Sequence, residues 1–138
     1  MAYPMESTSE HLAIAEQQHC TSNMIKFTAF DSCLGIVARK GKLLTAAHLV
    51  LHSKTGSAIG AQDAPEVASV FDQAPYDEID IVGEVSGWCQ GTFLPAFIGY
   101  RKNWFADDDQ EFSYDTDTRG IIGARISNLG KIVLYKQK

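Results

Sequence analysis

Cys33 and His48 are the residues of this chain whose types and spacing point most directly to chemistry. Each lies in an apolar segment, and Lys40-Gly41 between the two segments is suited to a tight turn. A two-residue turn at Lys40-Gly41 would place Cys33 directly opposite His48, with their Cβ atoms about 4.5–5.5 Å apart on one face of a hairpin. A bulge or another turn would shift this register and make the contact diagonal.

A thiol beside an imidazole can carry out nucleophilic catalysis. The imidazole of His48 would accept the thiol proton and lower the pKa of Cys33 below the free value of about 8.5. The thiolate would attack a carboxamide or acyl carbon, and His48 would return the proton to the leaving group. The bend at 31–33 offers backbone N–H groups, those of Ser32 and Cys33, to bind the oxyanion.

The same two residues also have a purely structural interpretation. A buried free cysteine such as Cys33 often acts as a small hydrophobic residue. A histidine in an apolar strand, such as His48, is often held there by hydrogen bonds alone. On that interpretation the chain is a binding or inhibitory module with an inert thiol, so catalysis and packing both stay open.

The segment SCLGIVARKGKLLTAAH, residues 32–48, resembles the catalytic segment of the cytotoxic-necrotizing-factor toxins. Those toxins deamidate a glutamine of Rho-family GTPases, and their catalytic histidine also follows the cysteine by fifteen residues. The bacterial chemoreceptor glutamine deamidases are similar in arrangement. The resemblance implies a toxin-like virulence effector that acts on a protein glutamine as a deamidase or, with an amine in place of water, as a transglutaminase.

The resemblance also implies a third group that orients the imidazole. The chemoreceptor deamidases use a threonine six residues before the cysteine, whereas the toxins use a backbone carbonyl from an earlier strand. Here Phe27 is six residues before Cys33 and Thr28 is five before it, so Thr28 is the threonine candidate for the orienting group. Ser32 directly precedes Cys33, without the glycine that usually stands between the serine and the cysteine, and this changes the expected oxyanion site.

Two other kinds of site compete with this interpretation. LLTAAHLV also resembles the histidine segment of trypsin-like proteases, with Asp80 as the aspartate, but no Gly-Asp-Ser-Gly element is present. His48 and His52 are four residues apart, but in a strand that spacing separates them by roughly 13 Å, which does not suit a shared metal ion. We therefore expect neither a metal nor a cofactor, since thiolate chemistry on a carboxamide needs none.

An α+β fold would have to position these residues. We expect mostly antiparallel β-sheets, sandwich-like, with one or two helices packed on them. The expected helices span 7–18 and 63–74, and the expected strands span 24–30, 34–39, 42–51, 79–85, 92–100, 120–126 and 131–135. An acidic loop is expected at 107–117. The whole of 1–138 is expected to be one catalytic domain, with 1–22 as an N-terminal helical extension.

Composition limits the partners and the compartment. The chain has 138 residues, a formal net charge of −5 and 45% hydrophobic residues, which favours a soluble protein and disfavours nucleic acid as a partner. Its three cysteines form no framework, so a reducing compartment is expected. No secretory signal or membrane span is apparent. We expect a soluble protein of the bacterial cytoplasm. The resemblance to the toxins implies that it would be delivered into a host cytosol by a route that needs no signal peptide.

Overall fold

The computed structural model describes residues 3–53, 56, 58–99, 104, 105, 107, 110–116 and 119–137. It is an α+β structure with nine strands and three short α-helices among these residues. The strands are β1 (Glu6–Ser7), β2 (Gln18–Ser22), β3 (Met24–Lys26), β4 (Leu34–Lys40), β5 (Leu43–Leu49), β6 (Glu78–Gly83), β7 (Ser113–Thr116), β8 (Ile122–Ile126) and β9 (Ile132–Lys136). The helices are the 3₁₀ turn η1 (Ala61–Asp63), α1 (Ala64–Ala68), α2 (Val85–Trp88) and α3 (Phe93–Ile98).

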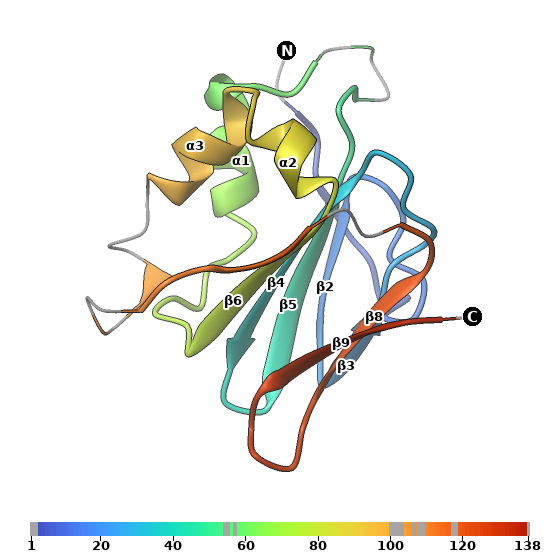
Figure 1. The fold of residues 1–138 in the computed structure, drawn as a ribbon, viewed down its shortest axis with the longest axis vertical. Coiled ribbons are helices and arrows are strands. Elements are labelled where there is room, and N and C mark those ends of the chain that lie inside the picture. Colours follow the sequence, from blue (N-terminus) through green and yellow to red (C-terminus); the bar gives the residue numbers. More distant parts are fainter. Residues whose placement is uncertain are drawn as a thin grey trace.

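Two sheets form the framework. The larger sheet has the order β1-β2-β5-β4-β6-β7, and its outermost pairs, β1 with β2 and β6 with β7, are parallel. The smaller sheet, in the order β3-β8-β9, is antiparallel and crosses in front of the larger one (Figure 1). The expected antiparallel-rich α+β class is confirmed, with three helices in place of one or two.

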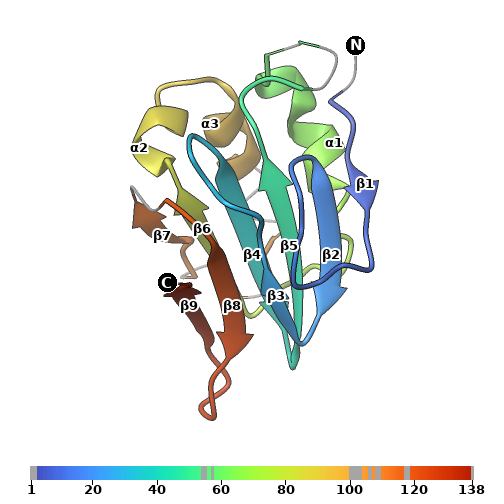
Figure 2. The same ribbon diagram turned by 90° about the vertical axis from the view of Figure 1, so that its right-hand side faces the viewer.

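The two faces of β4 point into different cores, because side chains alternate along a strand. Leu34, Ile36 and Ala38 pack with the helices in the first core. Cys33 and Val37 belong to the second core, which lies against the smaller sheet. The turned view shows β8 and β9 on one side of β4 and β6, with the helices gathered at one end of the sheet (Figure 2).

The expected helix at 7–18, and with it the helical extension at 1–22, is wrong. This segment forms β1, a series of turns and the start of β2. Its backbone bonds to distant strands: the N–H of Ile14 donates to the carbonyl of Lys26, and the N–H of Gln17 donates to that of His48. Tertiary hydrogen bonds therefore override the weak helical pattern of the sequence.

The expected strand at 92–100 is also wrong, because residues 93–98 form α3. Phe93, Leu94 and Phe97 bury one helical face in the first core, and Pro95 lies in the first turn, where a missing N–H costs little. Part of the acidic stretch at 107–117 lies outside the described residues, and 113–116 form β7 rather than loop. No helix of the described residues is long and apolar enough to cross a membrane.

Candidate active site

The hairpin of β4 and β5 forms as expected, but its turn lies one residue later in the sequence than expected. Lys40 pairs with Leu43, so the turn is Gly41-Lys42 and not Lys40-Gly41. Gly41 has φ of +63° and Lys42 has a negative φ, which fits a type II′ turn with glycine in the first central position. His48 therefore faces Gly35, and Cys33 is its diagonal neighbour on the same face of the sheet.

The imidazole of His48 is fully buried and held by a backbone carbonyl. Its Nδ1 lies 2.8 Å from the carbonyl oxygen of Ile14, so Nδ1 carries the proton and donates it. The hydroxyl of Thr28 lies 3.4 Å from the same nitrogen and also donates to the Ile14 carbonyl at 3.4 Å. This tautomer leaves Nε2 with its lone pair free, and Nε2 is buried without a hydrogen-bond partner.

The segment 14–17 fixes His48 from two sides. The Ile14 carbonyl binds the ring, and the N–H of Gln17 donates to the backbone carbonyl of His48 at 2.7 Å. Gln17 has φ of +63°, and its side-chain amide donates to the carbonyl of Pro4. A left-handed residue outside glycine marks a backbone held by its surroundings. The same segment carries Glu16 between these two anchors.

Cys33 contacts Glu16 instead of His48. The thiol donates to Oε2 of Glu16 at 3.6 Å. Burial raises the pKa of the Cys33 thiol to about 11, the Glu16 carboxylate raises it as well, and a hydrogen bond from the backbone of Asp31 opposes them. The expected lowering of this pKa by His48 is therefore absent in this state, in which Cys33 is a neutral thiol.

Burial has the complementary effect on the histidine. Desolvation lowers the pKa of His48, while the hydrogen bond to Ile14 and the charge of Glu16 oppose the shift. The imidazole is therefore neutral near pH 7. A neutral ring with a free Nε2 lone pair is the form that can accept a proton.

The backbone at Cys33 is held by the turn between β6 and α2. Trp88 Nε1 donates to the Ser32 carbonyl at 2.8 Å, and the N–H of Glu84 donates to the Cys33 carbonyl at 3.0 Å. Since the C=O and N–H of one trans peptide point in opposite directions, the N–H of Cys33 points away from Trp88. Gly83 makes the close approach possible: it has φ of +114°, and a Cβ there would lie 2.3 Å from the Cys33 oxygen.

Two phenylalanines close the site above His48. The ring centroids of Phe27 and Phe30 lie 5.5 and 4.7 Å from that of His48. Both rings rest on Gly35, where a Cβ would lie 2.8 Å from Phe30 and 3.0 Å from Phe27. The missing side chain of Gly35 thus provides the room in which the imidazole and the two rings pack together.

The structure brings only some of the expected site residues into one region. Cys33 and His48 share one face of the sheet and Thr28 contacts His48, whereas the Ser32 side chain is exposed at the entrance to β4. The positions of Ile14 and Glu16 could not be read from the sequence. Any residue has a carbonyl, and the segment that carries both was expected to be helical.

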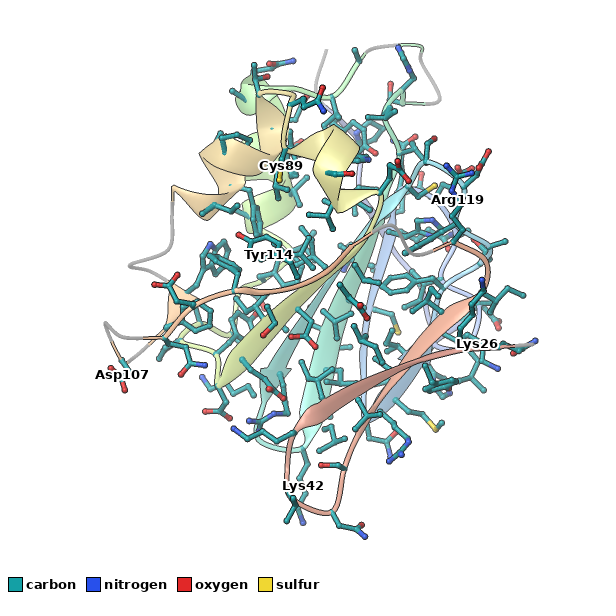
Figure 3. The ribbon with its side chains drawn as sticks, viewed as in Figure 1. Lys26, Lys42, Cys89, Asp107, Tyr114 and Arg119 are labelled. Atoms are coloured by element: carbon teal, nitrogen blue, oxygen red, sulfur yellow. The ribbon has the colours of Figure 1, made fainter. Side chains whose placement is uncertain are left out.

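The competing sites are not assembled. Asp80 on β6 faces Val37 and Ser113, and β4 lies between β6 and the strand of His48, so these two residues do not form a protease pair. No group of three or more histidine, cysteine, aspartate or glutamate side chains in the described part of the chain could hold a metal ion. Cys89 is exposed among the helices (Figure 3).

Comparisons with known proteins assign the chain to no group. The sequence matches no protein-family model, and it matches none of the curated proteins.

Proposed function

We propose that this protein is a cysteine-dependent protein-glutamine deamidase, with Cys33 as the nucleophile and His48 as the general base and acid. The observation that carries the proposal is the 2.8 Å contact between Nδ1 of His48 and the Ile14 carbonyl. It fixes the tautomer whose Nε2 can accept a thiol proton, on the sheet face that also bears Cys33. A backbone carbonyl from an earlier segment is also the orienting group that the toxin resemblance implies.

The reaction uses only groups of this chain and water. Nε2 takes the thiol proton, the Cys33 sulfur bonds to the carboxamide carbon, and the N–H of Cys33 helps to bind the oxyanion. His48 then protonates the leaving nitrogen, the C–N bond breaks, and ammonia departs, which leaves a thioester on Cys33. Water, deprotonated by His48, hydrolyses the thioester to glutamate, and an amine in place of water would give transglutamination. Thr28 helps to orient the ring through its contacts with Nδ1 and the Ile14 carbonyl.

The proposed substrate is a protein that carries a reactive glutamine. The resemblance over 32–48 suggests a Rho-type GTPase of a host cell, which would make the protein a delivered effector. A chemoreceptor is the other substrate class that the resemblance suggests.

Mass spectrometry of candidate proteins tests this proposal. Wild-type protein should convert a specific glutamine to glutamate, a gain of about one mass unit. Cys33→Ser should abolish the conversion, and His48→Gln should slow it by about 10²–10⁴-fold. Cys89→Ser is the matched control and should keep full activity, because Cys89 is exposed and lies at the C-terminal end of α2, not on the sheet that carries His48. A conversion that Cys33→Ser leaves intact, or none across purified GTPases, chemoreceptor fragments and a broad lysate, would contradict the proposal.

One observation favours a second candidate, a non-catalytic binding or inhibitory module on the same fold. The Cys33 thiol contacts Glu16 and has a raised pKa, as an inert cysteine would. In that case Cys33→Ser should leave the binding of a partner unchanged and no glutamine should be modified. The mass measurement therefore separates the two functions.

A further inference from the structure

Glu16 occupies the position next to the Cys33 sulfur that a catalytic base would occupy. Oε2 of Glu16 lies 3.6 Å from Sγ, and the thiol points to this carboxylate while Nε2 of His48 is left without a partner. Glu16 is exposed to solvent, whereas Cys33 is 5% exposed and His48 is fully buried. The carboxylate that contacts the buried thiol is therefore itself accessible to solvent.

Other charged and polar groups in this region already have partners. Arg119 lies 3.5 Å from Asp31 and 3.7 Å from Glu84, at the end of the sheet where β4 begins (Figure 3). The hydroxyl of Tyr3 donates to the Val50 carbonyl. No lysine or arginine among the described residues forms an ion pair with Glu16, so none of them neutralises the charge that acts on Cys33.

We propose that Glu16 is a cap that holds Cys33 in a resting, protonated state, and that a substrate carboxamide opens the site by displacing it. This inference rests on the proposed function and adds regulation to the same site. In the resting state the S–H bond points to the carboxylate. When the carboxylate moves away, the thiol turns towards Nε2, the proton passes from sulfur to that nitrogen, and Glu16 stays ionised throughout.

The segment around Glu16 suits such movement. Its neighbours are anchored by backbone and side-chain hydrogen bonds, at Ile14 to the ring of His48 and at Gln17 to the His48 carbonyl and to Pro4. The exposed Glu16 side chain can therefore rotate without disturbing the groups that orient the imidazole. The cap would prevent reaction of the thiol with small electrophiles until a protein substrate docks.

The rate of alkylation of each cysteine by iodoacetamide tests the cap. Peptide mapping would follow Cys33, with Cys20 and Cys89 in the same sample as internal references, from about pH 6 to about pH 10. Glu16→Gln keeps the size of the side chain and removes its charge. It should lower the apparent pKa of Cys33 and speed its alkylation at about pH 7 by about tenfold, because one pKa unit is a tenfold change in thiolate.

Glu10→Gln is the matched control, because Glu10 is also exposed and does not contact Cys33. It should leave all three alkylation rates unchanged. A Glu16→Gln protein whose Cys33 reacts no faster than wild type at any pH would overturn the inference, and so would an equal acceleration at Cys20 and Cys89. Alkylation needs no substrate, so its outcome is independent of whether a glutamine substrate is modified.

Discussion

The two faces of the six-stranded sheet use the same strands for different purposes. The face towards the helices is closed by large aromatic and aliphatic side chains, including Phe71, Phe93 and Phe97. The face towards the smaller sheet packs against Phe27 and Phe30 and carries two reactive residues, Cys33 and His48. The first face packs against the larger set of buried hydrophobic residues, whereas the second contains a buried imidazole with an unpartnered nitrogen.

This difference shows that a small protein can keep an energetically unfavourable arrangement of polar groups in its interior. A buried nitrogen without a hydrogen bond costs free energy, and a neutral thiol beside a carboxylate is a poor nucleophile. The aromatic core on the other face packs against the same strands, and its burial offsets part of that cost. The comparison predicts that substitutions on the helix face change stability most, and that substitutions on the second face change the reactivity of Cys33.

The largest loss of stability is expected from Phe97→Ala. The Phe97 ring is fully buried and packs against Trp104 and Phe93, with ring centroids 5.2 and 5.9 Å away. Removing it should lower the free energy of unfolding by about 3–5 kcal/mol, measured by urea denaturation. In the fraction that stays folded, the alkylation rate of Cys33 should match wild type. A loss below about 1 kcal/mol would contradict the role assigned to this core.

Gly35→Ala should lower stability less than Phe97→Ala does, but it should change the reactivity of Cys33 more. The new methyl group would collide with the rings of Phe30 and Phe27, which pack on His48. Displacing them should cost about 1–3 kcal/mol of stability and change the pH profile of Cys33 alkylation. Gly91→Ala is the control, since its Cβ would meet its nearest atom, the Trp88 oxygen, at 3.5 Å. If the two variants behave alike, the packing above His48 does not depend on Gly35.

The smallest effect is expected from Asp80→Asn, on the second face but away from His48. The pKa of Asp80 is raised from 3.8 to about 6, chiefly by burial and also by the charges of Glu78 and Asp115, while a hydrogen bond from Ser113 opposes the shift. The folded state therefore binds the proton more tightly than the unfolded state, and the contribution of Asp80 to stability falls as the pH rises from about 4 to about 6.

The asparagine variant keeps a neutral side chain at every pH. At about pH 7.5 its free energy of unfolding should exceed that of wild type by roughly 1 kcal/mol, and at about pH 4 the two should be equal. The difference at the higher pH is smaller than the full pKa shift implies, because Asp80 is partly exposed and solvent screens its charge. Urea denaturation at the two pH values measures the difference. Asp72→Asn, the same substitution at an exposed position, is the matched control. A stabilisation that is the same at both pH values would contradict the assignment to Asp80.

The sequence was most informative where side-chain pattern and local turns decide the structure. The hairpin of β4 and β5, strand β6 and the closing hairpin of β8 and β9 follow their apolar patterns and turn residues. The face shared by Cys33 and His48 survived the register error, because moving the turn by one residue shifts each cross-strand pair by two positions in total and so preserves the face.

The sequence was least informative where backbone groups and distant contacts decide the structure. Residues 7–18 lack a helix because their N–H and carbonyl groups bond to β3 and β5, which local propensity does not report. The Ile14 carbonyl and the position of Glu16 follow from that path. Residues 93–98 form α3 and not the expected strand, because the apolar residues at 93, 94 and 97 have helical spacing. Pro95 made that helical pattern hard to recognise in the sequence.

The link between sulfur and imidazole can be measured in the uncapped protein. In the Glu16→Gln background, the alkylation rate of Cys33 at about pH 7 should fall by about tenfold when His48 is also replaced by glutamine, which can still donate to the Ile14 carbonyl. That loss would show that Nε2 accepts the thiol proton across the two strands. An identical rate with and without the imidazole would mean that Cys33 and His48 do not act together.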